Sequence, residues 1–340
     1  MGKQAELFKG ELMEEKLRQY FLEAGYYVAR GVKYHFKGNE ITDVDLFLYG
    51  RFSSLSRERL NVDLKNKKSS KAFERILWAK GLQQLLEFEG CVVATMDRRE
   101  VVRMYGQQNG VKILDGSFLQ KLNYSLTERY SEEEFLEELL RFKSFKTHNN
   151  KSWKIIYERS KSMLLNELDF SGFNSNLITA KYFAQRVFDH QKASTALRAL
   201  YIVLSHGMII LDFLLKDIAF MEQKLRHESL NDGLKFGNLG REGVNRTIEM
   251  AVQIAGSDLS PSSIRKSIET NEMDILREYF SKSEVSRNLF KVAIEFERAS
   301  FARNIIHPDN LNIELKGIVA VMLDYFEIKR QDFFNINLNP

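Results

Sequence analysis

The sequence contains little cysteine and little proline: among 340 residues there are one cysteine, Cys91, and three prolines. A single cysteine excludes a disulfide framework and a cysteine-based zinc cluster. The N-terminal segment MGKQAELFKG lacks the apolar run that a secretory signal needs. The most apolar helical stretch, Tyr201 to Leu215, is interrupted by His206 and Asp212 and is too short to span a bilayer. We therefore expect a soluble, cytoplasmic protein that does not bind a membrane.

A strong excess of one charge is also missing, since 50 Lys and Arg stand against 46 Asp and Glu. The distribution is uneven, however: residues 30–80 contain 12 basic and 6 acidic side chains. A local basic excess is what a phosphate-facing surface needs, although a solvated basic face explains it equally well. The 44% of hydrophobic residues is enough for proper cores and excludes a disordered chain.

The first 125 residues alternate between helical and strand periods. Helices are expected at 7–23, 70–87 and 98–108 and after Gly116, and strands at 26–36, 41–50, 59–65, 91–95 and 111–114. Strands joined by short loops pair antiparallel, whereas strands separated by helices form parallel crossovers. The pattern predicts an α/β domain with an αβββαβ core, in which helices flank a mixed sheet.

From about Ser131 the strand signal disappears. An acidic helix is expected at 131–142, and the polar segment KSFKTHNNKS that follows is typical of a linker. Beyond it, helical periods are expected at 152–168, 175–188, 192–220, 242–255, 261–280, 284–304 and 311–329. We therefore predict an N-terminal α/β domain at 1–125, a helix and linker at 126–150, and an all-α helical bundle at 151–340.

Acidic and basic side chains share one face of the expected strand RLNVDLK. Residues at i and i+2 of a strand point to the same side, so Asp63 and Lys65 project together. If the preceding strand pairs antiparallel, Asp45 comes beside Asp63, and Asp43 lies on the same face. Two close carboxylates favour a hard divalent cation, Mg²⁺ or Mn²⁺, which activates water, and Lys65 then orients or deprotonates that water. The alternative is a salt bridge on a solvated sheet face.

These residues resemble the PD-(D/E)XK nuclease superfamily and, within it, the Mrr-like restriction endonucleases. The resemblance covers Gly10 to Leu122 and rests on four motifs in order. They are Gly10-Glu11-Leu12-Met13-Glu14 with Leu22, Gly25 and Tyr26; Thr42-Asp43-Val44-Asp45-Leu46; Val62-Asp63-Leu64-Lys65; and the closing segment VVATMDRREVVRMYGQQNGVKILDGSFLQKL. The resemblance implies a restriction-endonuclease-like fold and metal-dependent cleavage of DNA.

The resemblance also implies roles for single residues. Asp45 and Asp63 become metal ligands, Lys65 the catalytic lysine, and Glu14 the first-helix glutamate at the metal site. Where some members have Gln-x-Lys after the third motif, this chain has Asn66-Lys67-Lys68.

Basic residues follow the third motif directly. Four of them are candidate phosphate contacts, with solvated surface positions as the alternative: Lys67, Lys68, Lys71 and Arg75. Phe73 and Trp78, at helical spacing in the same segment, are expected in the core rather than stacked on bases.

The helical half carries one further motif, Arg303-Asn304-Ile305-Ile306-His307-Pro308. It resembles the R-N-x-x-x-H motif of HEPN domains, in which Arg and His cleave RNA without metal, but it is one residue short. The alternative is that Arg303 and His307, at i and i+4, only cap the end of a helix, and we favour this interpretation for catalysis.

Three functions therefore follow. The first is a Mg²⁺- or Mn²⁺-dependent DNA endonuclease, a bacterial restriction or anti-phage defence effector whose helical domain mediates homo-oligomerisation or docking of a partner protein of the defence system. The second is a HEPN-type metal-independent ribonuclease that uses Arg303 and His307. The third is a non-catalytic nucleic-acid-binding scaffold. The intact set of Asp45, Asp63 and Lys65 favours the first.

Overall fold

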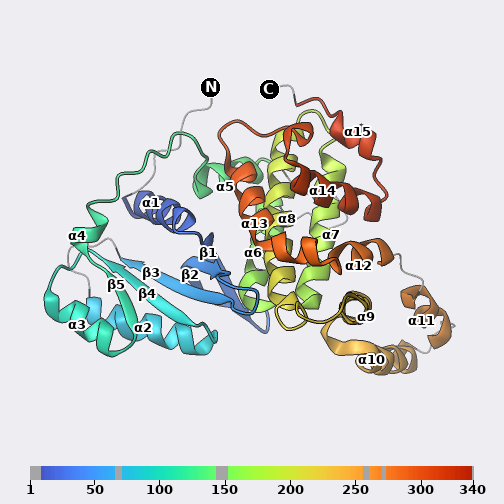
Figure 1. Cartoon of the computed structure of the whole chain (residues 1–340), viewed down its shortest axis with the longest axis horizontal. Helices are drawn as coiled ribbons and strands as arrows, with labels where there is room; N and C mark the ends of the chain where they lie inside the picture. The colour runs from blue at the N-terminus through green and yellow to red at the C-terminus, as the bar shows by residue number, and fades with distance from the viewer. Residues whose placement is uncertain (1–8, 66–70, 143–151, 256–259, 270–272, 339–340) are drawn as a thin grey trace. The chain divides into compact units, whose positions relative to one another are not determined.

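The computed structural model describes residues 9–65, 71–142, 152–255, 260–269 and 273–338 (Figure 1). The chain divides into two compact units. The first contains Met1–Asn166 and Arg298–Ile305, and the second contains Glu167–Glu297 and Ile306–Pro340. Residues 126–142, which the sequence assigns to a helix and linker, belong to the first unit by this division, and so does α6 (Trp153–Asn166), the first helix expected for the bundle.

A five-stranded mixed sheet forms the centre of the first unit. Its strands follow chain order: β1 (Tyr27–Phe36), β2 (Asn39–Gly50), β3 (Glu58–Lys65), β4 (Gly90–Thr95) and β5 (Val111–Leu114). The first three strands pair antiparallel, whereas β3 with β4 and β4 with β5 pair parallel. The mixed sheet expected from the sequence is confirmed, because short loops permit only antiparallel neighbours and the helical crossovers return the chain in parallel.

Helices cover both faces of this sheet (Figure 1). On one face, α1 (Lys9–Glu23) places Leu17, Phe21 and Leu22 against the even-numbered apolar residues of the strands, such as Val62. On the other face, α2 (Ala72–Leu85) and α3 (Glu100–Gln108) pack against odd-numbered residues, such as Val93. The period-two alternation of β3 therefore turns Asn61, Asp63 and Lys65 toward the α2 face.

Three further helices and one returning segment complete the first unit. They are α4 (Gly116–Leu119), α5 (Glu132–Leu140), α6, and residues 298–305. Ser131 begins α5 with a capping box, since its hydroxyl accepts from the Glu134 N–H and the Glu134 carboxylate accepts from the Ser131 N–H. The Asn166 side chain fastens the end of α6 to the β1 backbone at Lys33 and His35.

All the regular secondary structure that is described in the second unit is helical. Its helices are α7 (Phe170–Arg186), α8 (Ala193–Leu215), α9 (Gln223–Phe236), α10 (Gly240–Ala255), α11 (Pro261–Glu269), α12 (Asp274–Phe280), most of α13 (Ser283–Phe301), α14 (Ile313–Tyr325) and α15 (Arg330–Phe334). The expected helical content is confirmed. The sequence did not predict α9, whose polar composition hides the apolar period, and it predicted one helix where α11 and α12 are two.

Helix α8 lies within the helix expected at 192–220 and extends the apolar stretch Tyr201–Leu215 toward the N-terminus. With 23 residues it is long and apolar enough to cross a membrane by length and composition, so the expectation that it is too short was wrong. Of its most apolar window, 89% is buried inside the structure. This burial is consistent with the core helix of a soluble protein.

Candidate functional site

The ladder between β2 and β3 stops next to the predicted carboxylates. The paired register runs from Leu46 opposite Val62 to Gly50 opposite Glu58, and Asp45 is the residue just before it on β2. The Asp45 Oδ2 accepts a hydrogen bond of 2.6 Å from the Leu64 backbone N–H. A carboxylate thus engages a β3 backbone donor at the point where the two strands stop pairing.

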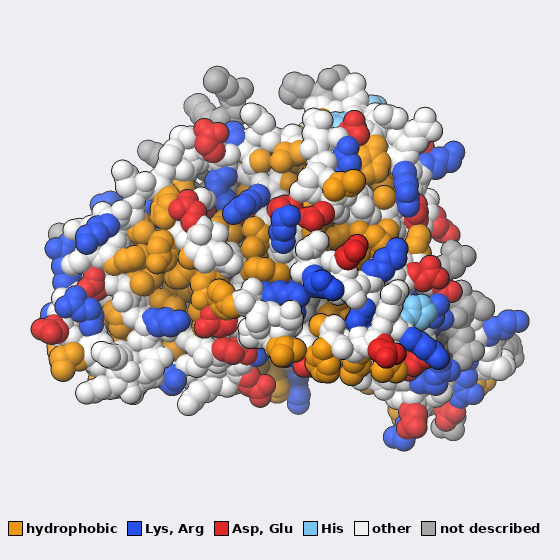
Figure 2. Space-filling model, in the orientation of Figure 1, with side chains coloured by type: hydrophobic (Ala, Val, Ile, Leu, Met, Phe, Trp, Pro, Cys, Tyr) orange, Lys and Arg blue, Asp and Glu red, His pale blue; other side chains and the backbone are white. Residues whose placement is uncertain are grey.

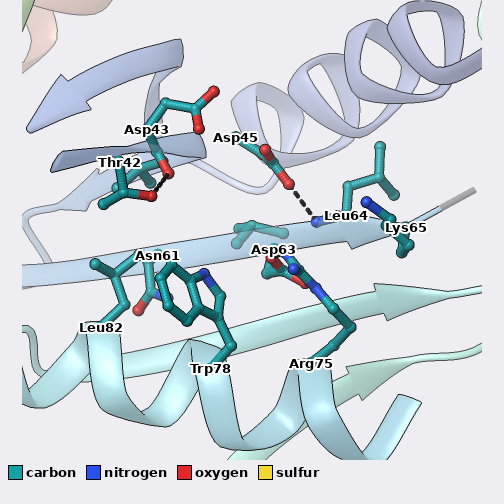
Figure 3. A pocket seen from close by; sticks show the side chains of 12 residues that line it. Thr42, Asp43, Asp45, Asn61, Asp63, Leu64, Lys65, Arg75, Trp78 and Leu82 are labelled. Atoms are coloured by element: carbon teal, nitrogen blue, oxygen red, sulfur yellow. Dashed lines mark hydrogen bonds and ion pairs between the residues drawn. The ribbon is translucent and has the colours of Figure 1, made fainter. Parts of the chain in front are cut away.

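A pocket of about 240 Å³ lies at this point, and we call it the β2–β3 pocket (Figure 3). Asp45, Asp63 and Lys65 all line it, so the structure brings together the three residues that the sequence placed on one polar face. Its remaining walls come from both strands and from α2: Thr42, Asp43, Val44, Asn61, Val62, Leu64, Arg75, Trp78 and Leu82.

Asp63 is held by a guanidinium from α2. Its side chain is only 6% exposed, and Arg75 Nε donates to its Oδ2 at 2.7 Å, while Arg75 Nη2 forms an ion pair with its Oδ1. Such two-point pairing is the strongest common form of the Arg–carboxylate contact. The sequence offered Arg75 as a phosphate contact and did not predict this pair, because the two residues belong to different elements.

Asp45 lies between opposing influences. Burial raises the pKa of its carboxyl, and the neighbouring Asp43 also raises it. The hydrogen bond from the Leu64 N–H and the charges of Arg75 and Lys65 lower the same pKa. The net effect is a pKa above the ordinary value. A further positive charge at the pocket would lower this pKa and favour the ionised carboxylate.

Glu14 does not line the pocket, although the resemblance placed it at the metal site. Its carboxylate accepts from Arg30, at 2.5 Å from Nη2 and 3.2 Å from Nε. Burial and the negative charge of Asp45 raise the pKa of Glu14, whereas Arg30 lowers it. The Glu14 and Asp45 carboxylates therefore interact electrostatically. Glu14 therefore pairs with Arg30, and its charge still interacts with that of Asp45.

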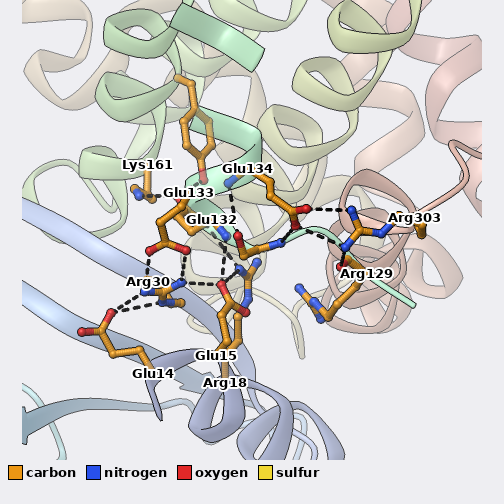
Figure 4. A network of polar contacts seen from close by, with 12 residues as sticks. Glu14, Glu15, Arg18, Arg30, Arg129, Glu132, Glu133, Glu134, Lys161 and Arg303 are labelled. Atoms are coloured by element: carbon orange, nitrogen blue, oxygen red, sulfur yellow. Dashed lines mark hydrogen bonds and ion pairs between the residues drawn. The ribbon is translucent and has the colours of Figure 1, made fainter. Parts of the chain in front are cut away.

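Arg30 belongs to a buried cluster of charges that the sequence did not predict (Figure 4). We call this cluster the ionic network; it consists of Glu14, Glu15, Arg18, Arg30, Glu132, Glu133 and Lys161. It joins α1, β1, α5 and α6 within the first unit. Arg30, only 3% exposed, pairs with three carboxylates, those of Glu14, Glu15 and Glu133. No local pattern reveals such a cluster, because its α1 and β1 members lie more than one hundred residues before their α5 partners in the chain.

Glu132 shows how strongly the ionic network favours charge. Burial opposes its ionisation, but Lys161 and Arg18 outweigh burial and lower its pKa to about 2. Lys161 Nζ donates to Glu132 at 2.6 Å, and the Tyr157 hydroxyl donates to the same oxygen at 2.7 Å. Glu132 is therefore ionised at neutral pH and ties α6 to α5.

The aromatic residues of α2 divide between core and pocket. Phe73 is partly buried and packs against the α2–α3 core beside Tyr105, with ring centroids 5.3 Å apart. Trp78 was also expected in the core, and this was wrong, since it is 49% exposed and lines the β2–β3 pocket. The buried stripe of α2 follows Ala72, Ile76 and Ala79, and Trp78 lies beside that stripe.

The candidate phosphate contacts have different surroundings. Lys67 and Lys68 lie outside the residues that the structure describes. Lys71 is exposed and pairs with Glu74 at 3.0 Å, whereas Arg75 pairs with Asp63. On the face of the molecule in Figure 2, basic and acidic side chains are interspersed rather than gathered by sign.

Arg303 and His307 have separate partners in different units. Helix α13 ends at Phe301, two residues before Arg303. Arg303 donates to Glu134 at 2.8 Å and to the Arg129 carbonyl at 2.7 Å, within the first unit. His307, in the second unit, caps a short 3₁₀ helix (Pro308–Asn310): its Nδ1 accepts from the Asp309 N–H, and its Nε2 donates to the Ile336 carbonyl at 2.9 Å.

The donor set of the β2–β3 pocket fits a hard cation that keeps part of its water shell. Mg²⁺ is commonly held by one or two carboxylates together with water, and Asp45 and Asp63 supply two carboxylates in one pocket. Among the described residues, no group of three or more His, Cys, Asp and Glu is arranged to hold a metal. The fit is therefore to a site of two carboxylates, one of which already pairs with Arg75.

Compared with family models, with curated proteins and with solved structures, the chain matches none of them.

Proposed function

We propose that this protein is a Mg²⁺- or Mn²⁺-dependent DNA endonuclease whose active site is the β2–β3 pocket. The observation that carries the proposal is the convergence of Asp45, Asp63 and Lys65 on one pocket where the β2–β3 ladder ends. Their order along the chain and the mixed sheet that holds them are those implied by the resemblance to PD-(D/E)XK nucleases. We further propose a cytoplasmic defence effector that acts as a homo-oligomer or with a partner protein.

Each residue has a defined task in hydrolysis. Asp45 and Asp63 would hold the cation. The Leu64 N–H orients the Asp45 carboxylate, and before a cation binds Arg75 balances the charge of Asp63. A bound divalent cation stabilises charge on the phosphate and makes a water more acidic. Lys65, on the same face of β3, would orient the attacking water. The water gives up a proton as its oxygen bonds to phosphorus, the P–O bond to the leaving oxygen breaks, and that oxygen takes up a proton.

Cleavage assays test this proposal directly. Supercoiled plasmid and duplex oligonucleotides are incubated with the protein and Mg²⁺, Mn²⁺ or EDTA, using wild type and Asp45→Asn. Cleavage that requires the cation and is lost in Asp45→Asn is the expected result. Cleavage that survives chelation contradicts the proposal, and cleavage of RNA alone that His307→Ala abolishes indicates the HEPN-type ribonuclease instead.

One observation favours a second candidate, a non-catalytic nucleic-acid-binding scaffold. Both oxygens of Asp63 are engaged by Arg75, as in a purely structural ion pair. A scaffold of this kind binds DNA with equal affinity in Ca²⁺ and in EDTA and cleaves in neither Mg²⁺ nor Mn²⁺. A gel-shift titration run beside the cleavage assay separates the two candidates.

A further inference from the structure

The Arg75–Asp63 pair stands in direct competition with any cation at the β2–β3 pocket. Arg75 Nε and Nη2 take one oxygen each of a carboxylate that is 6% exposed. A divalent cation bound through Asp63 needs at least one of those oxygens. The guanidinium and the cation therefore compete for the same carboxylate oxygens. Their positive charges also repel each other.

Arg75 has room to leave, whereas Asp63 does not. The Arg75 side chain is 28% exposed and rises from the first turns of α2 at the rim of the pocket (Figure 3). Asp63 is fixed on β3, where it pairs with Val93 of β4 directly after Val62, the last β3 residue paired with β2. If the pair opens, the guanidinium is the partner that moves, and it moves toward solvent at the mouth of the pocket.

We propose that Arg75 is an exchange residue: it holds Asp63 until a divalent cation takes that carboxylate, and its guanidinium then binds a phosphate of the nucleic acid. The proposal rests on the proposed function in placing the cation at Asp45 and Asp63. It goes further in coupling the two ligands, because the cation both occupies the site and releases the phosphate-binding arginine. Guanidinium forks bind carboxylate and phosphate with the same two-point geometry, which makes the exchange chemically matched.

The chain offers a matched control in Lys71. It precedes Ala72, the first residue of α2, about one helical turn from Arg75, and pairs with Glu74 rather than with Asp63. Its side chain is 76% exposed and does not line the pocket. Replacing either residue with Gln removes one positive charge from the same region, but only Arg75→Gln removes the partner of Asp63. Differences between the two variants therefore report the contact rather than the net charge.

Cation binding is the first measurement, and it needs no catalysis. Mn²⁺ is titrated calorimetrically into full-length wild type, Arg75→Gln, Arg75→Lys, Lys71→Gln and Asp63→Asn. We expect Arg75→Gln to bind Mn²⁺ about tenfold or more tightly than wild type, and Lys71→Gln to stay within about twofold, since exposed charges are well screened. Arg75→Lys keeps the charge without the fork and is expected to fall between wild type and Arg75→Gln. A thermal melt of each variant confirms that it is folded.

Luminescence of Tb³⁺ sensitised by Trp78 tests whether the cation lies in the β2–β3 pocket. Trp78 lines the pocket, and the other of the two tryptophans, Trp153, is buried in α6. Tb³⁺ emission excited through the indole should therefore appear in wild type, strengthen at lower Tb³⁺ in Arg75→Gln, and vanish in Trp78→Phe. Emission that persists in Trp78→Phe places the cation elsewhere and overturns the proposal.

DNA binding is the second measurement. In Ca²⁺, Arg75→Gln should bind duplex DNA several-fold more weakly than wild type, with a salt slope that is lower by about 1, because one phosphate contact is lost. In EDTA the two proteins should bind equally, since Arg75 then stays on Asp63. Lys71→Gln should show the same affinity change, if any, in both conditions.

The outcomes separate the two proposals. If Mn²⁺ binding depends on Asp63 but is equal in Arg75→Gln and Lys71→Gln, the exchange is wrong and the cation site stands. If Asp63→Asn binds Mn²⁺ as well as wild type, or no variant binds it, both the cation site and the exchange are overturned. Weaker DNA binding by Arg75→Gln in EDTA as well as in Ca²⁺ contradicts the exchange alone.

Discussion

Two regions of the first unit bring carboxylates and cationic side chains together, and they differ in how the charges are enclosed. In the ionic network, Glu15, Arg18 and Arg30 are at most 3% exposed, and Arg18 pairs with two carboxylates and Arg30 with three. In the β2–β3 pocket, Asp63 is buried but Arg75 is 28% exposed and the adjoining Trp78 is 49% exposed. The comparison teaches that enclosure, rather than charge content, distinguishes a structural cluster from a site with room for a ligand.

The energetic consequence follows from desolvation. Charges removed from water are stabilised only by their partners, so deleting one partner leaves the others unpaired at a cost of several kcal/mol. At the pocket, solvent reaches the rim and screens what a substitution leaves behind. Substitutions in the ionic network should therefore affect folding, and substitutions in the pocket should affect ligand binding and chemistry.

The largest expected effect is on catalysis, from Lys65→Ala. If Lys65 assists proton transfer, its removal should lower the rate of cleavage about 10²- to 10⁴-fold. The midpoint of thermal unfolding should stay close to that of wild type, because Lys65 lies at the end of β3 and is only half-buried. Single-turnover cleavage in Mg²⁺ measures the first quantity, and Lys71→Ala is the control expected to retain most activity. A Lys65→Ala protein that cleaves at the wild-type rate removes the lysine from the mechanism.

The second prediction concerns Arg30→Ala in the ionic network. It leaves Glu14, Glu15 and Glu133 without their shared cation and should lower the free energy of unfolding by about 3–5 kcal/mol. Lys33→Ala is the control on the same strand, since Lys33 pairs with a single exposed carboxylate, that of Glu40, and should cost about 0–1 kcal/mol. Urea unfolding followed by circular dichroism compares the two, and equal losses would refute the distinction between enclosed and exposed pairs.

The third prediction is a pH dependence from Glu132. Its pKa is about 2 in the folded protein, against an ordinary value of 4.5. Because the folded pKa is the lower one, the stabilisation is complete above about pH 4.5 and is lost as the pH falls toward 2. At 1.36 kcal/mol per pKa unit this amounts to about 3 kcal/mol.

Glu132→Gln tests the same point. The variant should be less stable than wild type at pH 7, and the two stabilities should converge as the pH approaches 2. Urea midpoints measured from pH 7 to 2 give both curves. If the stabilities of wild type and Glu132→Gln stay equally far apart down to pH 2, the pKa of Glu132 is not lowered in the folded protein as Lys161 and Arg18 imply.

The smallest expected effect comes from Trp78→Ala, and the buried Trp153 provides the comparison. Trp78→Ala removes a half-exposed ring at the pocket and should cost less than about 1 kcal/mol of stability. Trp153→Ala empties a fully enclosed site beside Phe142 and should cost about 3–5 kcal/mol. Urea unfolding of both variants compares their losses in free energy of unfolding. A loss for Trp78→Ala as large as that for Trp153→Ala would contradict the contrast between the pocket and the interior.

Much of the fold could be predicted from local pattern. The alternation in β3 showed which residues share a face, and short loops against helical crossovers distinguished antiparallel from parallel pairing. Helices with weak or polar periods were harder: α9 went unpredicted, and Trp78 was expected in the core because apolar character was read without the width of the buried stripe of α2. Each miss arose where burial depends on neighbours distant in the sequence.

The candidate site divides in the same way. The sequence by itself determined that Asp63 and Lys65 project together and that Asp45 comes beside them, because a strand has period two and a hairpin sets the register. Only the tertiary structure decided that Arg75 reaches across from α2 to hold Asp63, and that Glu14 turns to Arg30 instead of lining the pocket. The reason is physical: a charged side chain takes the partner that packing brings within hydrogen-bond distance, and packing between elements follows from the whole core rather than from any local run of residues.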